Sequence, residues 1–338
     1  MPRAFIEHRL RAAWQRRGTV AVLLWPLSRL YGALAARQRG RDDAVAVRLP
    51  VPVVVVGNVV AGGAGKTPTT LAMAQHLRSR GWRPGIISRG HGRVADDCRE
   101  VLPDSDPREV GDEPLLLRRR ADVPVFVAPR RADAGRALLV AHPGTDILLC
   151  DDGLQHRALA RDVEVCVFDA RGVGNGWLLP AGPLREPWPR PVDLVLWTEA
   201  DAAATPLPPG QATFTAHRRL ADHALRADGT RVPLADLRGQ PLAALAGIAR
   251  PEAFFAMLRA AGLTLADTLA LPDHYDFDSF NRLSGQRNGL ICTEKDALKL
   301  WRHVPDALAV PLQLDVPAAF FDALDQRLTT QGYHPRQP

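Results

Sequence analysis

Residues 51–67 limit the fold of this chain more than any other segment. Val51-Pro-Val-Val-Val-Val56 is a continuous, mostly β-branched apolar run, which is typical of a parallel strand buried on both faces. The glycine-rich Ala61-Gly-Gly-Ala-Gly-Lys-Thr67 follows it, and residues 68–80 then have helical periodicity. A strand, a glycine-rich loop and a helix in this order predict a P-loop and therefore a nucleotide site.

The predicted nucleotide-binding groups belong to this loop. Its backbone N–H groups and the helix N-terminus would hold the phosphates. Lys66 would reach the β- and γ-phosphates, and the hydroxyl of Thr67 would bind Mg²⁺. Val60 stands where the usual pattern has its first glycine, so the loop either begins with a different backbone angle or belongs to a variant subfamily. The predicted loop residues are Gly62, Gly63, Ala64, Gly65, Lys66 and Thr67.

Apolar, strand-like runs alternate with helical stretches through much of the chain. Further strand candidates are residues 84–88, 123–127, 146–150, 164–169 and 193–198. This alternation predicts an α/β fold with a doubly wound, mostly parallel sheet. From residue 213 the pattern changes to short segments around Asp228-Gly229, which is a typical hairpin turn.

We therefore expect four parts. An N-terminal basic amphipathic helix covers 1–40, a P-loop core covers 41–212, a β-hairpin linker covers 213–235, and a smaller α/β domain covers 236–333. The hairpin would act as a hinge between the two α/β parts.

The positive charge is concentrated at the N-terminus. The net charge is +6, and the first 41 residues contain nine arginines but only one acid, Glu7. The rest of the chain is nearly neutral, which argues against a nucleic-acid groove. The apolar run from Val20 to Trp25 is shorter than the ~20 residues that cross a bilayer. It predicts an interfacial helix on an anionic membrane, with an ordinary helix packed on the domain as the alternative.

Lysine is rare in this chain. Lys66, Lys295 and Lys299 are its three lysines, although lysine and arginine together number 43. One of the three lies in the phosphate-loop pattern, which makes a chance match less plausible. The four cysteines form no CxxC pair and indicate no metal or redox site.

Asp146-Ile-Leu-Leu-Cys-Asp151-Asp152 is an apolar strand that ends in two acids. Carboxylates at the C-terminal end of such a strand face the ligand crevice of an open α/β sheet. One of them can hold the Mg²⁺ shell while the other orients a metal-bound water or an acceptor hydroxyl. The alternative is a pair that caps the turn before Gly153.

Four other segments are weak signals individually. Gly111-Asp-Glu-Pro114 and Thr293-Glu-Lys-Asp296 are explained by helix capping. Asp273-His274-Tyr275 contains a histidine that is more often structural than catalytic, and Gly182-Pro-Leu-Arg-Glu-Pro187 is either a lid or a tight surface turn.

Together these segments resemble a known family. The series GNVVAGGAGKTP, SRGHGR, GDEPLLL, DDGLQH, LLPAGPLREP, AGIARPEAFF, LPDHYDF and TEKDALKL, in this order, is similar to the tetraacyldisaccharide 4'-kinase family. The resemblance extends from about Val51 to Leu300. His91 stands in SRGHGR where an aromatic tyrosine is expected.

The resemblance implies a P-loop kinase that uses ATP and Mg²⁺. It would transfer the γ-phosphate to the 4'-hydroxyl of tetraacyldisaccharide 1-phosphate and so form lipid IVA in lipid A synthesis. We expect a monomer at the cytoplasmic face of the bacterial inner membrane, bound through its N-terminal helix, with the acylated disaccharide lipid as substrate and no nucleic-acid partner.

The resemblance also implies roles for individual residues. Asp112 would take the acceptor's proton, and His274 would hold and tune that carboxylate with support from Asp273. The implied roles of the other site residues are phosphate binding for Lys66, metal and active-site acids for Asp151 and Asp152 beside Thr67, and a mobile loop near the nucleotide for Arg185 and Glu186.

Two other functions are weighed against this one. A P-loop NTPase that works as a switch would need a partner protein and no acceptor sugar, and it gives the segments at 182–187, 273–275 and 293–296 no role. A non-enzymatic binder of membranes or nucleic acid would lose only nucleotide affinity when Lys66 is replaced by alanine.

Overall fold

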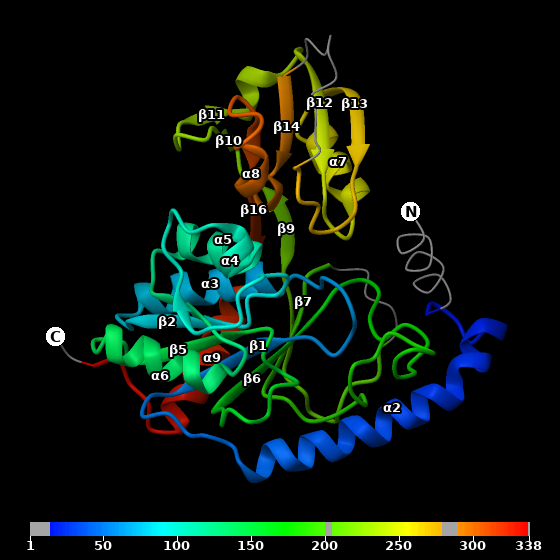
Figure 1. Cartoon of the computed structure of the whole chain (residues 1–338), viewed down its shortest axis with the longest axis vertical. Coiled ribbons are helices and arrows are strands. Elements are labelled where there is room, and N and C mark those ends of the chain that lie inside the picture. The colour runs from blue at the N-terminus through cyan, green and yellow to red at the C-terminus, as the bar shows by residue number, and fades with distance from the viewer. Residues whose placement is uncertain (1–13, 200–204, 279–288, 337–338) are drawn as a thin grey trace.

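A computed structural model describes residues 14–199, 205–278 and 289–336, and it contains two large β-sheets (Figure 1). The larger sheet has eight strands in the order β3-β4-β2-β5-β1-β6-β7-β8. All its neighbouring strands are parallel except β3 and β4. The strands are β1 (Val53–Gly57), β2 (Pro84–Ser88), β3 (Arg99–Glu100), β4 (Val125–Val127), β5 (Ile147–Asp151), β6 (Val163–Phe168), β7 (Leu194–Trp197) and β8 (Thr213–Thr215). The predicted α/β fold with a mostly parallel sheet is confirmed.

Helices cover both faces of this sheet. In β1, Val54 and Val56 belong to one core cluster, and Val53 and Val55 belong to the other. The first cluster includes side chains of α3 (Lys66–Ser79), α5 (Asp112–Ala121) and α9 (Ala318–Thr330), and the second includes side chains of α6 (Arg131–Ala141). A strand buried on both faces must be apolar throughout, which explains the continuous valine run.

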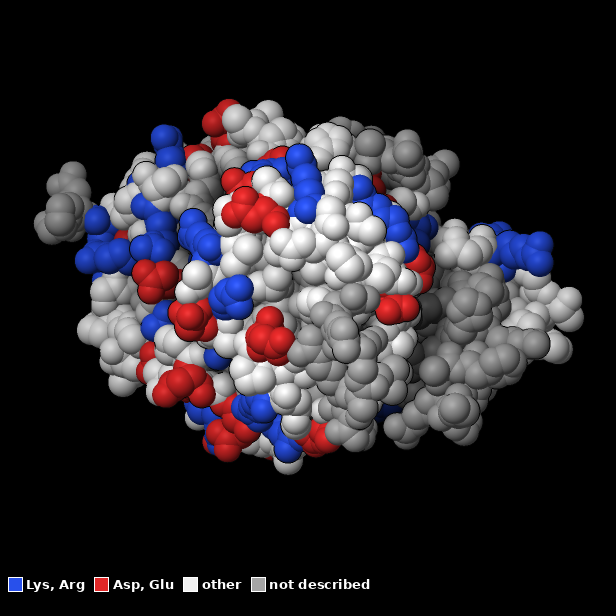
Figure 2. Space-filling view, turned by 90° about the horizontal axis from the view of Figure 1, so that it is seen from above, with Lys and Arg blue, Asp and Glu red and all other residues white. Residues whose placement is uncertain are grey.

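The second sheet has six strands in the order β11-β10-β15-β14-β12-β13. Its elements are β10 (His223–Leu225), β11 (Arg231–Pro233), the 3₁₀ turn η1 (Leu234–Leu237), β12 (Pro241–Ala246), α7 (Pro251–Ala260), β13 (Thr264–Ala270), β14 (Gly289–Thr293), α8 (Glu294–Leu300) and β15 (Leu308–Val310). Acidic and basic side chains are intermixed on the face seen from this end of the molecule (Figure 2).

The predicted hairpin segment divides among three sheets. Strands β10 and β11 pair antiparallel around the turn that contains Gly229, which has φ 83°. Strand β8 instead extends the large sheet parallel to β7, and β9 (His217–Leu220) pairs antiparallel with β16 (Leu312–Asp315). The β9–β16 pair lies between the two large sheets (Figure 1), so the chain crosses between them twice.

Helix α9 returns to the large sheet after the second sheet is complete. Its buried residues Phe320, Leu324 and Leu328 belong to the same core cluster as Val54. The smaller domain expected over 236–333 did not anticipate this return. Local periodicity shows that a helix buries one face, but it does not show which sheet that face covers.

The long helix α2 (Thr19–Ala44) runs along the large-sheet part, at the end away from the second sheet (Figure 1). It falls largely within the helix expected over 1–40, and its 26 residues extend well beyond the apolar run Val20–Trp25 because the helix continues through Pro26. By length and composition it is able to cross a membrane. Its exposed apolar residues are Val20, Val22, Leu23, Trp25, Leu27, Leu30 and Leu34. The earlier part of the predicted N-terminal segment, residues 1–13, lies outside the described residues.

Candidate active site

The P-loop is fixed through its carbonyl groups. The Asn58 side-chain amide donates to the Gly62 carbonyl at 3.1 Å, the Arg171 guanidinium to the Gly63 carbonyl at 2.7 Å, and the Thr198 hydroxyl to the Ala64 carbonyl at 3.2 Å. These three hydrogen bonds fix the loop through its carbonyls, and the N–H groups of such a loop are the groups suited to an anion. Lys66 and Thr67 begin α3 directly after the loop.

The structure explains why a valine, Val60, can stand where the usual pattern has its first glycine. It is buried and forms an antiparallel bridge with Leu184, and the neighbouring Ala61 N–H donates to the Pro183 carbonyl at 2.8 Å. The loop therefore begins as an extended segment paired with residues 183–185. Val60 is not among the described residues with positive φ, so its position does not require glycine.

The two acids at the end of β5 have different environments. Asp151 is fully buried; its Oδ1 accepts from the Thr70 hydroxyl at 2.8 Å, while its Oδ2 has no hydrogen-bond partner. Burial, helped by the nearby charge of Glu113, raises the pKa of Asp151 to about 7. A buried carboxylate oxygen without a partner is suited to a cation or a cation-bound water.

Asp152 is paired with two cations. Its Oδ1 lies 2.8 Å from the Arg185 guanidinium and 3.8 Å from Lys66 Nζ. Burial disfavours its charged form, but Lys66 and Arg185 outweigh burial and lower the pKa of Asp152 to about 2. Its φ of 50° is left-handed, a conformation that aspartate tolerates better than most residues.

These residues fit Mg²⁺, which takes few protein ligands and completes its shell with phosphate oxygens and water. Within the part of the chain that the structure describes, no group of three or more histidine, cysteine, aspartate or glutamate residues is arranged to hold a metal. The fitting donors are the Thr67 hydroxyl and the unpartnered Asp151 Oδ2, with Asp152 nearby.

Asp112 begins α5, which packs on the large sheet, and it contacts His274, which follows β13 of the second sheet. The Nδ1 of His274 lies 3.1 Å from Oδ2 of Asp112, although 162 residues separate them. The preceding Gly111 has φ 94°, and a Cβ there would lie 3.1 Å from the Gly90 Cα. Only glycine fits that backbone and contact, so the glycine of the GDEP segment positions Asp112.

The backbone also fixes the histidine side of this pair. His274 has φ 62°, and its N–H donates to the Gly247 carbonyl at 3.2 Å. The Gly247 N–H in turn donates to Asp296 at 2.9 Å, and Asp296 is also hydrogen-bonded to Thr293 at the start of α8. The capping contacts predicted for 293–296 therefore exist, and they join α8 to the histidine loop.

Helix α8 adds two site residues that the prediction missed. Lys299 Nζ lies 2.9 Å from the same Asp112 oxygen that His274 contacts. Lys295 Nζ lies 3.2 Å from His274 Nε2 and 3.3 Å from Asp273. Burial opposes the charge of Asp112, but its contacts with His274 and Lys299 outweigh burial and lower the pKa of Asp112. The sequence signals for this pair were the rarity of lysine and the TEKDALKL motif, which contains both lysines.

Glu113 connects the two groups of site residues. Its carboxylate lies 3.7 Å from Lys295, and its charge contributes to the raised pKa of Asp151. Glu113 is therefore close both to Asp151 at the end of β5 and to Lys295 beside the Asp112–His274 pair.

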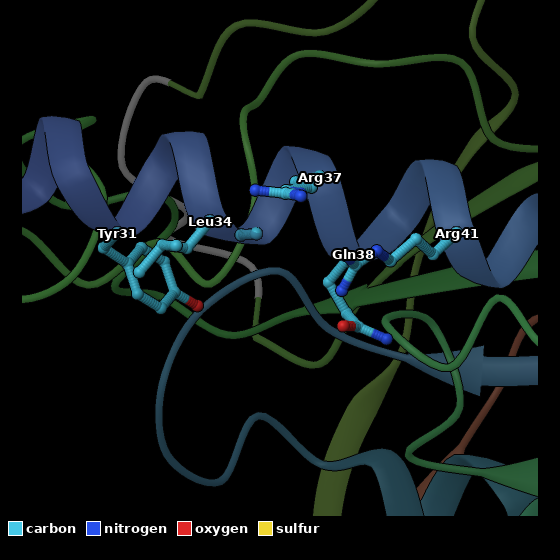
Figure 3. Close-up of a pocket in the computed structure, with 6 residues that line it drawn as sticks. Tyr31, Leu34, Arg37, Gln38 and Arg41 are labelled. Carbon is cyan, nitrogen blue, oxygen red and sulfur yellow. The ribbon is translucent and has the colours of Figure 1, made fainter.

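The loop with Arg185 and Glu186 is held in place beside this region. Arg185 also contacts Asn58, and the Gln155 amide donates to Glu186 at 2.6 Å. The Tyr31 hydroxyl on α2 donates to the Arg185 carbonyl at 2.9 Å. Tyr31 lines a hollow of about 460 Å³ along α2. The side chains that line this hollow come from successive turns of the helix (Figure 3). The mobility expected of this loop stays a prediction.

The comparison with protein families identifies the family of this chain. Residues 20–329 match the family described as Tetraacyldisaccharide-1-P 4'-kinase, LpxK. The chain belongs to this family. The tetraacyldisaccharide 4'-kinase of Acidovorax sp. (strain JS42) is 63% identical over 328 residues, which cover 96% of each chain. That of Delftia acidovorans (strain DSM 14801 / SPH-1) is 56% identical over 323 residues and 94% of each chain.

A solved structure of the LpxK family has the same fold. The LpxK of Aquifex aeolicus, described as an "apo" form in complex with ATP, matches with a TM-score of 0.77 and 27% identity. The match covers 93% of this chain and 100% of that one. The predicted family, fold class and enzyme class, a P-loop kinase, are confirmed.

Proposed function

We propose that this kinase transfers the γ-phosphate of ATP to the 4'-hydroxyl of tetraacyldisaccharide 1-phosphate and so forms lipid IVA. The observation that carries this proposal is the 3.1 Å contact between Asp112 and His274 beside a P-loop. Transfer to a sugar hydroxyl benefits from a group that accepts the proton of that hydroxyl. An NTPase switch has no use for such a pair, assembled from two different sheets.

The P-loop side of the site would hold and align the nucleotide. The loop N–H groups and Lys66 would bind the phosphates, and Thr67 and Asp151 would hold the metal. Mg²⁺, when bound, supplies positive charge against the phosphate oxygens. Asp152, held between Lys66 and Arg185, keeps both cations oriented on the nucleotide side.

The contacts support the roles that the resemblance implies for Asp112 and His274. Asp112 is buried, and its Oδ2 lies 3.1 Å from His274 Nδ1 and 2.9 Å from Lys299 Nζ. We therefore assign proton acceptance to Asp112 and orientation of its carboxylate to His274.

The proposed step balances. The proton of the 4'-hydroxyl moves to the Asp112 carboxylate, the sugar oxygen forms a bond to the γ-phosphorus, and the bond from that phosphorus to the bridging oxygen breaks. ADP leaves with the electron pair. The transition state is stabilised chiefly by charge and positioning, and the base adds ~10²–10⁴-fold.

We further propose that α2 lies on the cytoplasmic face of the inner membrane. Contacts in its middle hold it on the protein: the Ser28 hydroxyl donates to the Leu178 carbonyl at 2.8 Å and accepts from the Ala181 N–H at 2.9 Å. Its exposed apolar side chains then suit the lipid interface, with Arg29, Arg37 and Arg41 near anionic headgroups. The monomeric state and the lack of a nucleic-acid partner stay predictions.

The domain division is also a proposal. The second sheet and its helices form the smaller unit, and the β9–β16 pair links it to the P-loop core. Because Asp112 and His274 lie on different units, any movement at this link changes the distance between them.

Transfer of label tests the proposed function directly. The purified full-length protein in detergent micelles is incubated with γ-labelled ATP, Mg²⁺ and the disaccharide 1-phosphate lipid. We expect label on the lipid. Release of labelled phosphate to water, with none on the lipid, would contradict the proposal and favour an NTPase switch.

A further inference from the structure

Arg218 belongs to the link between the two large sheets and contacts the side of the P-loop. It lies on β9, between the sheets (Figure 1), and its guanidinium donates to the Thr198 hydroxyl at 2.9 Å. Thr198 is fully buried and in turn donates to the Ala64 carbonyl of the loop. A Cβ at Gly65 would lie 3.0 Å from the Arg218 guanidinium and 2.9 Å from the Thr198 methyl group. The last glycine of the loop therefore allows both side chains to approach its backbone closely.

Glu199 connects this arginine to the second sheet. Its carboxylate lies 3.1 Å from the Arg218 guanidinium, and the same carboxylate oxygen also contacts Arg250. Arg250 directly precedes α7, which packs on β12 and β13 of the second sheet. A chain of contacts therefore runs from the second sheet to the P-loop. We call it the arginine relay, and its members are Arg250, Glu199, Arg218 and Thr198.

The burial and charge of the arginine relay suit it to act on the P-loop. The side chains of Arg218 and Glu199 are 18% and 24% exposed, whereas that of Arg250 is 39% exposed. The buried Nε of Arg218 has no hydrogen-bond partner in the part of the chain that the structure describes, so its terminal nitrogens hold the guanidinium in place. Because two arginines share one carboxylate, the relay keeps a net positive charge beside a loop suited to anionic phosphates.

We propose that Arg218, Glu199 and Arg250 are positioning residues that make nucleotide affinity at the P-loop depend on the second-sheet unit. This inference rests on the P-loop part of the proposed function. Arg250 fixes the Glu199 carboxylate, which in turn fixes Arg218, and Arg218 holds Thr198 against the loop. Without Arg250, the Glu199 carboxylate rotates more freely and its charge cancels that of Arg218. The AGIARPEAFF segment, which contains Arg250 and has no part in the transfer step, gains a role in this way.

Replacing Arg250 tests the arginine relay at its exposed end, away from the P-loop. We would measure Kd for ATP with Mg²⁺ by titration calorimetry, and KM for ATP and kcat for label transfer, with the full-length protein in micelles. In Arg250→Met we expect Kd and KM to rise ~5-fold or more, whereas kcat and the midpoint of unfolding without nucleotide should change little. Arg250→Lys should restore part of the affinity. Arg259→Met, which removes an exposed arginine from the other end of α7, is the matched control and should bind ATP normally.

Glu199→Gln provides a second test, because it interrupts the arginine relay in its middle. In that background Arg250→Met should weaken ATP binding by no more than about twofold, since both changes act through the same contacts. Losses that add in full overturn the inference, as does unchanged ATP affinity or a loss of kcat alone in Arg250→Met. Absence of ATP binding by the unmodified protein overturns the P-loop assignment together with the inference. Normal ATP binding without lipid labelling overturns only the proposed acceptor, so the failures are distinguishable.

Discussion

Thr70 donates its hydroxyl hydrogen bond to one oxygen of the buried Asp151 at 2.8 Å, and the other oxygen of that carboxylate has no partner. Replacing Asp151 with asparagine keeps an acceptor for Thr70 but removes the charge that faces the metal. We expect kcat to fall by ~10²-fold or more. Titration of transfer activity with Mg²⁺ checks this, and Thr70→Val is the comparison that removes the hydrogen bond alone. Unchanged Mg²⁺ dependence in Asp151→Asn would remove this residue from the metal site.

Asp112→Asn and His274→Ala separate the two assignments of the proton acceptor. If Asp112 accepts the proton, Asp112→Asn loses ~10²-fold or more in kcat/KM, whereas His274→Ala keeps the carboxylate and loses less. Nucleotide affinity should be unchanged in both, as measured by titration calorimetry. Near-normal transfer by Asp112→Asn beside an inactive His274→Ala would instead make His274 the base.

Gly111→Ala tests how the Asp112 side of the pair is positioned. A methyl group at φ 94° meets the Gly90 backbone at 3.1 Å, so we expect a loss of about 1–3 kcal/mol in the free energy of unfolding and a loss of transfer. Gly92→Ala is the matched control, because Gly92 also has positive φ but would meet nothing within 4 Å. Chemical denaturation and transfer assays measure both effects. Equal results for the two variants would rule out the Gly90 contact as the cause.

Leu23→Ser together with Leu27→Ser tests the membrane role of α2. Both leucine side chains are exposed on the helix. If a leucine lies fully in lipid, its substitution removes about 1.5–3 kcal/mol of apolar burial energy. We expect vesicle co-sedimentation to weaken by at least tenfold while the folded structure is kept. Val140→Ser, at an 84% exposed valine on α6, serves as the control. Binding that is equally weak in the control would show that α2 has no special part in it.

Glu164→Gln tests a pH-dependent contribution to the stability of the fold, at a residue away from the active site. Burial opposes the charge of Glu164, but Arg190 at 2.5 Å and Arg161 at 2.9 Å outweigh it and lower its pKa. A lowered carboxyl pKa stabilises the fold above the unfolded-state value, and this stability is lost as pH falls through the folded-state value. We expect the variant to lose about 1–3 kcal/mol at pH 7. The two proteins should converge as pH falls through the lowered pKa of Glu164, as followed by thermal unfolding. A pH-independent difference would contradict the electrostatic cause.

The sequence predicted those parts of the fold that depend on neighbouring residues. The valine run of β1 and the glycine loop are local signals, and so is the turn at Asp228-Gly229. The pairing of β9 with β16 was not predictable, because these strands are about 90 residues apart and short. Periodicity cannot choose a partner at that separation.

The same limit applies to the site. Motif resemblance brought Asp112 and His274 together, and their contact is present. Lys295 and Lys299 were missed because helix capping sufficiently explained the segment that begins at Thr293. Their partner Asp112 lies 187 residues from Lys299, and only the folded chain brings them into contact.

The return of α9 to the large sheet has a consequence for the order of synthesis. Phe320, Leu324 and Leu328 complete the core on which β1 rests. When a ribosome has translated the whole second sheet, α9 has not yet been synthesised. This is the helix that covers β6, β7 and β8. The P-loop half is thus the first to begin and the last to finish, so a chain cut short before residue 318 leaves an apolar face of β6, β7 and β8 uncovered.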